Sequence, residues 1–167
     1  MSDSTIILGI DPGSINTGYG LIKVQGSEIH VAHHGVLKVD SKKDIFHRIK
    51  LINAKVKELL EVFKPQAMAV EKIFFGKNVK SLIRLGEARG AAIVAAVNLS
   101  IPIYEYSALE VKQAVVGYGK ASKEQVQKMI QTLFRLQNLP EQNSADALAI
   151  ALCHTQVARF RERISHL

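Results

Sequence analysis

The feature that most constrains the fold is an apolar segment that ends at an acid and is followed by a second apolar segment. Residues 6–10 (IILGI) form an uninterrupted apolar run, Asp11 ends it, and residues 19–24 (YGLIKV) resume it after a turn with proline and glycine. A continuous apolar run bounded by turn residues is typical of a buried strand, and the short turn predicts an antiparallel return strand. The chain is therefore expected to begin with a strand pair whose turn carries a carboxylate.

The later elements are predicted from the spacing of apolar residues and from capping signals. We expect strands over residues 28–39, 67–70 and 101–106, and helices over 44–63, 77–99 and 107–117, from Ser122 onward, and from near Asn143 past Cys153. Three strands followed by alternating strands and helices predict an α/β fold with a mixed sheet flanked by helices. We expect a single domain over residues 1–167, with a short basic C-terminal tail at about 159–167.

The charge balance restricts the class of partner. Lysine and arginine number 22 against 15 acids, so the net charge is +7, which is typical of proteins that bind polyanions such as nucleic acid. A basic surface without a partner is the alternative. The apolar runs fall short of the ~18 residues of a membrane span, and the N-terminus carries no secretory pattern. The single cysteine, Cys153, is expected to be a small buried core residue, and we expect a cytoplasmic location.

Two acids occupy the ends of otherwise apolar strands. Asp11 ends the first strand and Glu71 ends the fourth, and a buried carboxylate needs a cation or a hydrogen-bond donor. If those strands are neighbours, both side chains converge, and Asp146 on the last helix can reach the same point. Clustered oxygens are the ligands that Mg²⁺ prefers, and two ions about 3.5–4 Å apart can promote phosphodiester hydrolysis. The alternative is that these are three unrelated surface acids.

The segment PEQNSADALA, residues 140–149, places Asn143 three residues before Asp146. Residues three apart in a helix lie on nearly the same face, so both can point at one site. A simpler interpretation is that Asn143 is the helix N-cap, with an acid at the positive end of the helix dipole.

Five motifs in this order carry a resemblance to a known family. They are ILGIDPGSINTGYG, VEKIFFGKN, LGEARGAAIVAA, VKQAVVGYGKASKEQVQ and SADALAIALCH. With them the chain resembles the RuvC family of Holliday-junction resolvases, which are RNase H-like nucleases. The resemblance implies an RNase H-like fold with a five-stranded sheet, and a homodimer that nicks four-way DNA junctions symmetrically during recombination and repair. It also implies Mg²⁺ as cofactor, with two ions and with Mn²⁺ as a substitute, and RuvA and RuvB as partners.

The same resemblance assigns the catalytic and metal-binding residues, namely Asp11, Glu71, Asn143 and Asp146. The family usually has an aspartate where this chain has Asn143. An amide oxygen can coordinate, but it brings no negative charge and cannot serve as a base. We therefore expect a catalytically impaired form, which fits an engineered substrate trap as well as a natural variant. The alternative is a junction-binding protein without catalysis.

An aromatic and several basic residues are expected to contact DNA. Phe74 follows Glu71 in a basic loop and is predicted to stack on an unpaired base, whereas Phe75 is predicted to be buried. The resemblance assigns backbone contacts near the scissile phosphate to Lys112 and Lys123, and such contacts position the DNA without reading its sequence. The long helix adds basic candidates at Lys77, Arg84 and Arg89.

The long helix also carries Gly86 and Gly90, whose spacing allows another helix to approach closely. The family's dimer places this helix at the subunit interface, and packing within one chain is the alternative.

Another class of protein shares part of the first motif. DPGSINTG resembles the phosphate-binding turn of ATP-binding proteins of the actin and sugar-kinase type, but that fold needs a second such domain, for which 167 residues leave no room. Transposon-associated and guide-RNA nucleases share the catalytic turn but not the motifs after Glu71.

Overall fold

The computed structural model describes residues 4–74 and 78–165. Within them the chain forms five strands and five helices, which alternate much as the apolar pattern predicts. The elements are β1 (Thr5–Asp11), β2 (Asn16–Gln25), β3 (Glu28–Lys38), α1 (Ile45–Phe63), β4 (Ala67–Glu71), α2 (Val79–Asn98), β5 (Ile103–Tyr106), α3 (Ala108–Val116), α4 (Lys123–Leu133) and α5 (Gln142–Ser165).

The strands form one mixed sheet in the order β3-β2-β1-β4-β5. The first three strands are antiparallel neighbours, and β4 and β5 run parallel to β1. The predicted α/β class and the mixed five-stranded sheet are therefore confirmed. Because β1 and β4 are parallel and Ile10 pairs with Val70, the acids that follow these two residues leave the sheet at the same edge.

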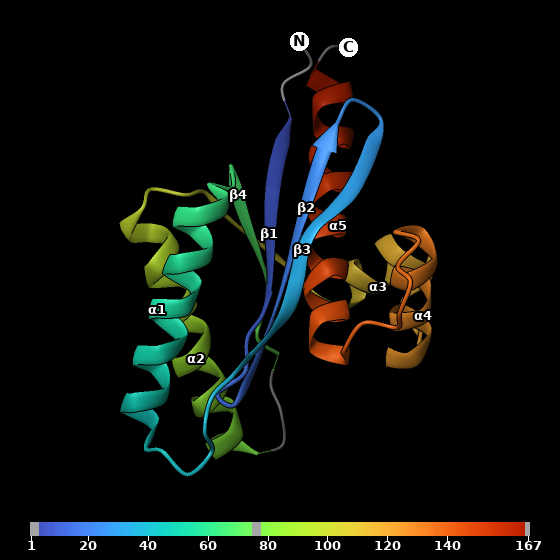
Figure 1. Ribbon diagram of the computed structural model, residues 1–167. Coiled ribbons are helices and arrows are strands. Elements are labelled where there is room, and N and C mark those ends of the chain that lie inside the picture. The colour runs from blue at the N-terminus through green and yellow to red at the C-terminus, as the bar shows by residue number, and fades with distance from the viewer. Residues whose placement is uncertain (1–3, 75–77, 166–167) are drawn as a thin grey trace.

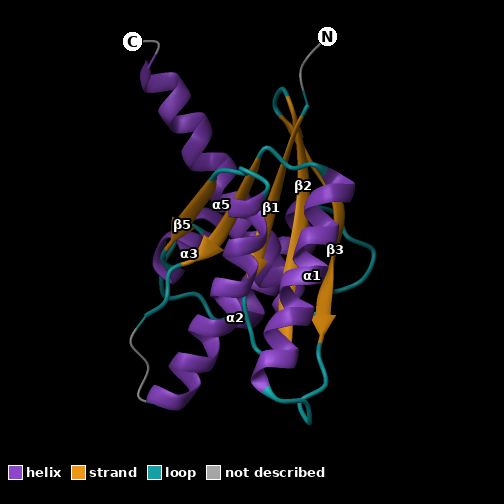
Figure 2. Ribbon diagram, turned by 90° about the vertical axis from the view of Figure 1, so that its left-hand side faces the viewer, coloured by secondary structure: helices purple, strands orange, loops and turns teal. Residues whose placement is uncertain are grey.

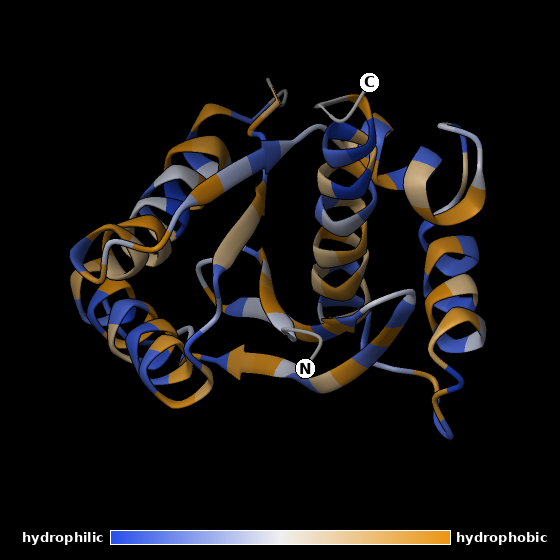
Figure 3. Ribbon diagram, turned by 90° about the horizontal axis from the view of Figure 1, so that it is seen from above, coloured by the Kyte–Doolittle hydropathy of each residue, from blue (hydrophilic) through white to orange (hydrophobic). Residues whose placement is uncertain are grey.

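Helices cover both faces of the sheet (Figure 1). The pair α1 and α2 packs on one face, and α5 packs on the other with α3 and α4 beside it (Figures 1 and 3). Along β1, Leu8 and Ile10 point into the α1–α2 core, whereas Ile7 points into the α5 core. Central strands covered on both faces must be apolar at every position, which accounts for the continuous run in the sequence. The last turns of α5 extend past the sheet (Figure 2).

Two glycines allow α5 to lie against the strands. A Cβ atom on Gly9 would stand 2.0 Å from the carbonyl oxygen of Ala147, and one on Gly18 would stand 1.9 Å from that of Asn143. No side chain fits at either position without moving the helix. Since Gly18 pairs with Asp11 across β1 and β2, this close contact brings the first turn of α5 to the acidic end of β1.

The structure corrects several details of the sequence-based expectations. α2 begins at Val79 with Asn78 as its N-cap, two residues later than predicted. α5 begins at Gln142, so Asn143 lies inside the first turn and is not the cap. His34, which nothing in the sequence distinguishes from a surface residue, is half-buried, whereas Cys153 is buried as predicted. Over the described residues, no helix is sufficiently long and apolar to cross a membrane.

Candidate active site

The turn after β1 is closed by a buried threonine. The Thr17 hydroxyl donates to the Gly13 carbonyl at 2.7 Å and accepts from the Gly13 amide at 3.3 Å, and its residue is fully buried. These two bonds cross the turn and fix its shape. Asp11 is thereby held at the C-terminal end of the central strand β1, with the first turn of α5 beside it.

Three carboxylates from three different elements line one cavity of about 230 Å³. Asp11 comes from β1, Glu71 from β4 and Asp146 from α5, and Lys112 and Lys123 complete its charged lining. The three acids are 60 and 75 residues apart in the sequence, so only the fold brings them together. Because they line the same cavity, the alternative that they are unrelated acids scattered over the surface is wrong.

Crowding and burial shift the ionisation of these acids. Burial, reinforced by the charges of Asp146 and Glu71, raises the pKa of Asp11 from 3.8 to about 7. Burial is also the main cause of the raised pKa values of Glu71 and Asp146, while Lys112 and Lys123 act in the opposite direction. Carboxylates that resist ionisation in one cavity favour a bound cation, because a cation removes their mutual repulsion.

Asn143 is directed at the same acids. Its Nδ2 donates a hydrogen bond to Oδ2 of Asp11 at 3.2 Å, and this bond lowers the pKa of Asp11 against the effect of burial. On the same turn, Gln142 donates to Oδ1 of Asp146 at 2.9 Å. An aspartate at position 143 could not donate in this way and would add a fourth negative charge. Two neighbouring amides thus occupy oxygens of two of the three acids.

The carboxylates do not form a ready metal-binding cluster. Among residues 4–74 and 78–165, no three histidine, cysteine, aspartate or glutamate side chains are grouped closely enough to hold an ion. The acids share a cavity, but their oxygens are not gathered around one point.

The groups expected to hold DNA surround the acids. Lys123 is 73% exposed, and its Nζ lies 3.9 Å from Oδ2 of Asp146. Phe74 is 88% exposed and lines a second cavity of about 200 Å³ together with Asp11 and Glu71. What distinguishes this ring from the other exposed rings, Phe46 and Phe160, is its place beside two of the acids. The structure therefore places one aromatic ring and two lysines around the acids.

The sequence of this chain matches the family model of the crossover junction endodeoxyribonuclease RuvC over residues 7–154. This chain belongs to the RuvC family. A RuvC of Citrifermentans bemidjiense is 48% identical over 153 residues, which is 92% of this chain and 93% of that relative. Membership supports the nuclease interpretation of the DPGSINTG turn over the ATP-binding one.

Solved structures agree with this membership. RuvC of Thermus thermophilus, in a complex described as containing a Holliday junction substrate, is 38% identical and superimposes with a TM-score of 0.87, covering 93% of this chain and 96% of that one. The yeast mitochondrial Holliday junction resolvase Ydc2 is only 15% identical, with a TM-score of 0.62 over 96% and 83% of the two chains, and shows the shared fold alone. The RNase H-like fold is confirmed.

The two arginines of α2 that were predicted to bind DNA have different surroundings in this RuvC family member. Arg84 pairs with Glu87 on its own helix at 3.1 Å, and its side chain is 37% exposed. Arg89 is turned inward, where it donates hydrogen bonds to the Glu71 carbonyl at the end of β4 and to the Glu105 carboxylate near the end of β5. Its donors thus have partners within the protein. Lys77 and Phe75 lie outside the described residues. The DNA contacts predicted for Arg84, Arg89 and Lys77 remain predictions.

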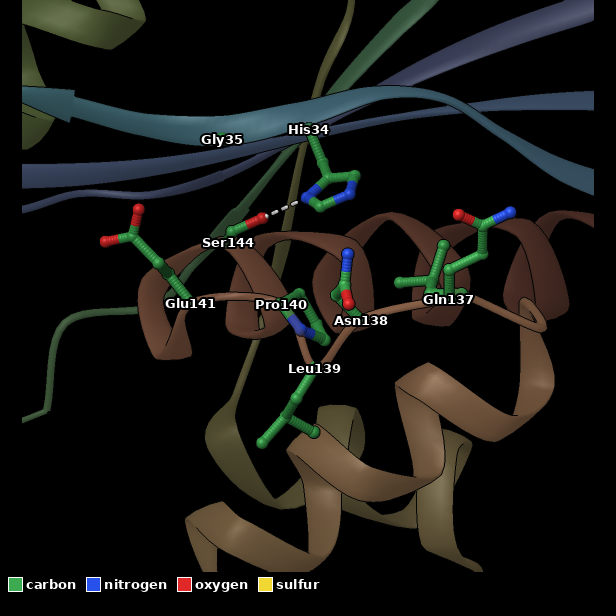
Figure 4. Close-up of a pocket in the computed structure, with 9 residues that line it drawn as sticks. His34, Gly35, Gln137, Asn138, Leu139, Pro140, Glu141 and Ser144 are labelled. Carbon is green, nitrogen blue, oxygen red and sulfur yellow. Dashed lines mark hydrogen bonds between the residues drawn. The ribbon is translucent and has the colours of Figure 1, made fainter.

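A further cavity of about 460 Å³ lies on the other side of the first turn of α5, between that turn, β3 and residues 136–141 (Figure 4). There Nδ1 of His34 and the hydroxyl of Ser144 form a hydrogen bond of 2.7 Å, and Lys38 pairs with Glu141 at 2.9 Å. The first contact ties α5 to β3, and the second ties the residue before α5 to the end of β3, so both help to fix the turn that carries Asn143 and Asp146. Nothing in the sequence pairs residues 110 positions apart, so the contact of His34 could not be predicted from it.

Proposed function

We propose that this chain is a junction resolvase whose active site consists of Asp11, Glu71, Asp146 and Asn143, and that residues 1–167 form one nuclease domain. The observation that carries the proposal is the shared cavity in which three carboxylates from β1, β4 and α5 meet Lys112 and Lys123. The substrate is a four-way DNA junction, in keeping with the Holliday junction bound by RuvC of Thermus thermophilus. The reaction is hydrolysis of one phosphodiester in each of two symmetric strands.

The donor set fits a hard divalent cation, with Mg²⁺ as the natural ion and Mn²⁺ as a substitute. Oxygen donors are what these ions prefer. Burial raises the pKa values of all three acids, and the charge of Asp146 raises those of Asp11 and Glu71 further. Asp11, Glu71 and Asp146 would hold two ions, with the Asn143 amide oxygen as a fourth donor. Because the carboxylate oxygens do not surround one point in the structure, the side chains would have to rotate to bind the ions. Such ions lower the pKa of water and stabilise the charge of the leaving oxygen.

The chain's own side chains would place the DNA over these acids. Lys112 and Lys123 flank the cavity and would bind the backbone around the scissile phosphate, with Arg84 and Lys77 adding backbone contacts. Phe74, exposed beside Asp11 and Glu71, would stack on a base at the opened crossover. Asn143 supplies neither charge nor a base, so cleavage by this chain should be slow.

A junction-binding protein without catalysis is the second candidate. It is favoured by one observation, the hydrogen bond in which the Asn143 amide already occupies Oδ2 of Asp11. In that case the basic and aromatic surface would remain functional while the acids would no longer support hydrolysis.

We assign the homodimer to the outer face of α2. A Cβ atom on Gly90 would meet nothing within 4 Å among the described residues, and one on Gly86 would approach only Ile73, at 3.9 Å. Close packing inside one chain therefore does not account for the glycines. Ile83 is 55% and Val94 50% exposed on the same helix. RuvA and RuvB as partners rest on the family resemblance, and a cytoplasmic location rests on the single cysteine of the sequence.

Single-turnover cleavage of an end-labelled four-way junction, in Mg²⁺ and in Mn²⁺, tests this proposal. We expect paired nicks in opposing strands at a low rate, and specific junction binding in Ca²⁺. Glu71→Gln should abolish the nicks and keep the affinity. The matched control is Glu61→Gln, which removes an exposed acid of α1 that pairs with Lys57. A chain that binds the junction no better than linear duplex would contradict the proposal.

A further inference from the structure

Arg89 connects α2 to the ends of two strands. Its Nε donates to the main-chain carbonyl oxygen of Glu71 at 3.1 Å, and its guanidinium pairs with the carboxylate of Glu105 on β5. The arginine side chain is only 14% exposed. A largely buried charge has to be paired and hydrogen-bonded, and both of its partners lie at the active-site end of the sheet.

The bonded carbonyl belongs to one of the three acids. Glu71 is the last residue of β4, and it pairs with Tyr106, the last residue of β5. The backbone amide of Lys72 still donates to the Tyr106 carbonyl at 2.8 Å, but regular strand pairing ends there. Arg89 therefore binds the backbone at the last paired residue of β4, where pairing with β1 on the other side has already ended at Val70. Its hydrogen bond therefore fixes the residue from which the Glu71 carboxylate projects.

The same contact closes the segment that carries Phe74. Residues 72–78 connect Glu71 to α2, and Arg89 on α2 bonds back to Glu71 across 18 positions. Ile73 and Phe74 line one cavity with Leu85 of α2, so the described start of this segment lies against the helix. Holding the two ends of a connecting segment together restricts the positions that its exposed ring can take.

We propose that Arg89 is a positioning residue that fixes both Glu71 and the segment bearing Phe74, and that it acts without touching DNA. The assignment rests on the proposed function of Glu71 and Phe74. The planar guanidinium offers donors in a fixed fork, so one side chain can bond a carbonyl and a carboxylate at once. Lysine keeps the charge, but its three donors share one nitrogen and do not reproduce the fork that reaches both acceptors.

This difference separates positioning from a phosphate contact. Arg89→Lys retains the positive charge that a DNA backbone would need, but it loses the fork. We expect Arg89→Lys to lower the single-turnover cleavage rate at least about tenfold, since small misplacements of catalytic groups have effects of this size. Junction affinity in Ca²⁺ should be unchanged. Glu105→Gln, which leaves the arginine in place and weakens its pairing, should act in the same direction. The rates are measured in the Asn143→Asp form of the full chain.

A second readout needs neither DNA nor metal. The chain contains no tryptophan, so Phe74→Trp introduces a single fluorescent reporter in the connecting segment. Adding Arg89→Lys or Glu105→Gln should lower the anisotropy of this tryptophan. The matched control is Arg159→Lys, because Arg159 also donates to a main-chain carbonyl, that of Gly26 at 2.7 Å, in the part of α5 that lies away from the acids.

The outcomes distinguish the assignments. A slower cleavage rate and lower anisotropy, with normal affinity and an unaffected Arg159→Lys control, support positioning. Normal cleavage and anisotropy in Arg89→Lys and Glu105→Gln, or a loss of affinity in place of a loss of rate, overturn it. If Arg89→Lys does not fold, Glu105→Gln decides. If the Asn143→Asp form fails to cleave any junction, the proposed function is wrong, whereas the anisotropy still tests the positioning contact.

Discussion

At the scale of single residues, Asn143 sets the expected rate of the site. Asn143→Asp replaces a neutral donor by a fourth negative charge beside Asp11, Glu71 and Asp146. We expect the variant to cleave a junction faster by an order of magnitude or more in Mg²⁺, where each ~1.4 kcal/mol removed from the barrier is a factor of ten. Single-turnover cleavage measures the rate, and junction affinity in Ca²⁺ should change little because the side-chain size is kept.

The neighbouring amide provides the control for this prediction. Gln142→Glu also places a negative charge on the first turn of α5, but it does so beside Asp146 instead of Asp11. It should not raise the cleavage rate. Equal rates for the unmodified chain and the Asn143→Asp variant would show that the missing charge does not limit this site.

Asp11 should make stability depend on pH when metal is removed. Its pKa is raised from 3.8 to about 7 in the folded chain, so between these values the folded state holds a proton that the unfolded chain has lost. Stability is then greatest at the acidic end and falls as pH rises toward 7, by up to about 1.4 kcal/mol per pH unit from this group. Above that pH the group adds no further slope.

Urea unfolding in EDTA at several pH values between 4 and 8 measures this slope. Asp11→Asn should flatten it, and Asp40→Asn, at an exposed loop position, should not. Because the pKa values of Glu71 and Asp146 are raised too, part of the slope should remain in Asp11→Asn. Mg²⁺ should restore stability near neutral pH in the unmodified chain. A slope of the opposite sign in EDTA would contradict the burial argument.

Phe74 should contribute to cleavage more than to binding. If its ring stacks on a base at the crossover, Phe74→Ala loses about 1–3 kcal/mol of that contact in the opened junction. We expect cleavage to slow about tenfold or more with a much smaller change in affinity. Phe160→Ala is the control, since Phe160 is likewise an exposed ring, at 64%, but lies on the last turns of α5. If the two substitutions slow cleavage equally, Phe74 has no specific stacking role.

Asp11 and Glu71 could be singled out from the sequence because each one ends an apolar strand, and Asp146 followed from the family resemblance. Arg89 and His34 could not. Arg89 contacts Glu71 and Glu105, and His34 contacts Ser144, and these residues become neighbours only after the sheet is assembled. In a sequence, a basic residue on a helix is typical of a solvated surface.

At the scale of elements, α2 is where the proposed dimer can be tested. Gly90→Leu adds a side chain to a position where a Cβ atom meets nothing within 4 Å among the described residues. Replacing a helical glycine should stabilise the monomer by roughly 0.5–1 kcal/mol, since glycine is a poor helix former. The same bulk should obstruct a partner helix. We expect Gly90→Leu to raise the dimer dissociation constant while the melting temperature at low concentration does not fall.

Sedimentation velocity over a range of concentrations measures the dissociation constant. Ala54→Leu, on the exposed side of α1, adds similar bulk and should leave the dimer unchanged. A Gly90→Leu chain that dimerises normally would place the interface elsewhere.

The order of the elements was predictable because continuous apolar runs and helical spacing differ strongly in this chain, and because Ser107 and Ser122 cap helices as expected. The N-cap of α5 was not. The helix begins at Gln142, one residue before Asn143, so Asn143 lies in its first turn although asparagine is a favoured N-cap residue. The carbonyl oxygen of Asn143 faces Gly18 of β2, a contact that no local signal in the sequence indicates.

At the scale of the whole molecule, a net charge of +7 predicts a polyanionic partner but not the face that binds it. The fold supplies that face, because Lys112 and Lys123 lie on α3 and α4 yet line the cavity of acids from β1, β4 and α5. Their positive charges lie beside the proposed catalytic acids, where the proposed function requires a phosphate to bind. A dimer would carry two such cavities, so a substrate with two symmetric backbones fits it better than one linear duplex.

Junction binding should therefore be selective and strongly dependent on salt. Each phosphate that a lysine neutralises releases counterions, and the logarithm of the affinity falls by about 0.9 per contact for each tenfold rise in salt. Lys123→Ala should make this slope shallower, by about one contact for each active site engaged. Lys57→Ala, which removes a lysine paired with Glu61 on α1, should leave the slope unchanged. Titration of a labelled junction in Ca²⁺ at increasing salt, with unlabelled linear duplex as competitor, measures both properties. Equal competition by duplex and junction would mean that charge alone holds the DNA, and that the pairing of two cavities does not select the four-way geometry.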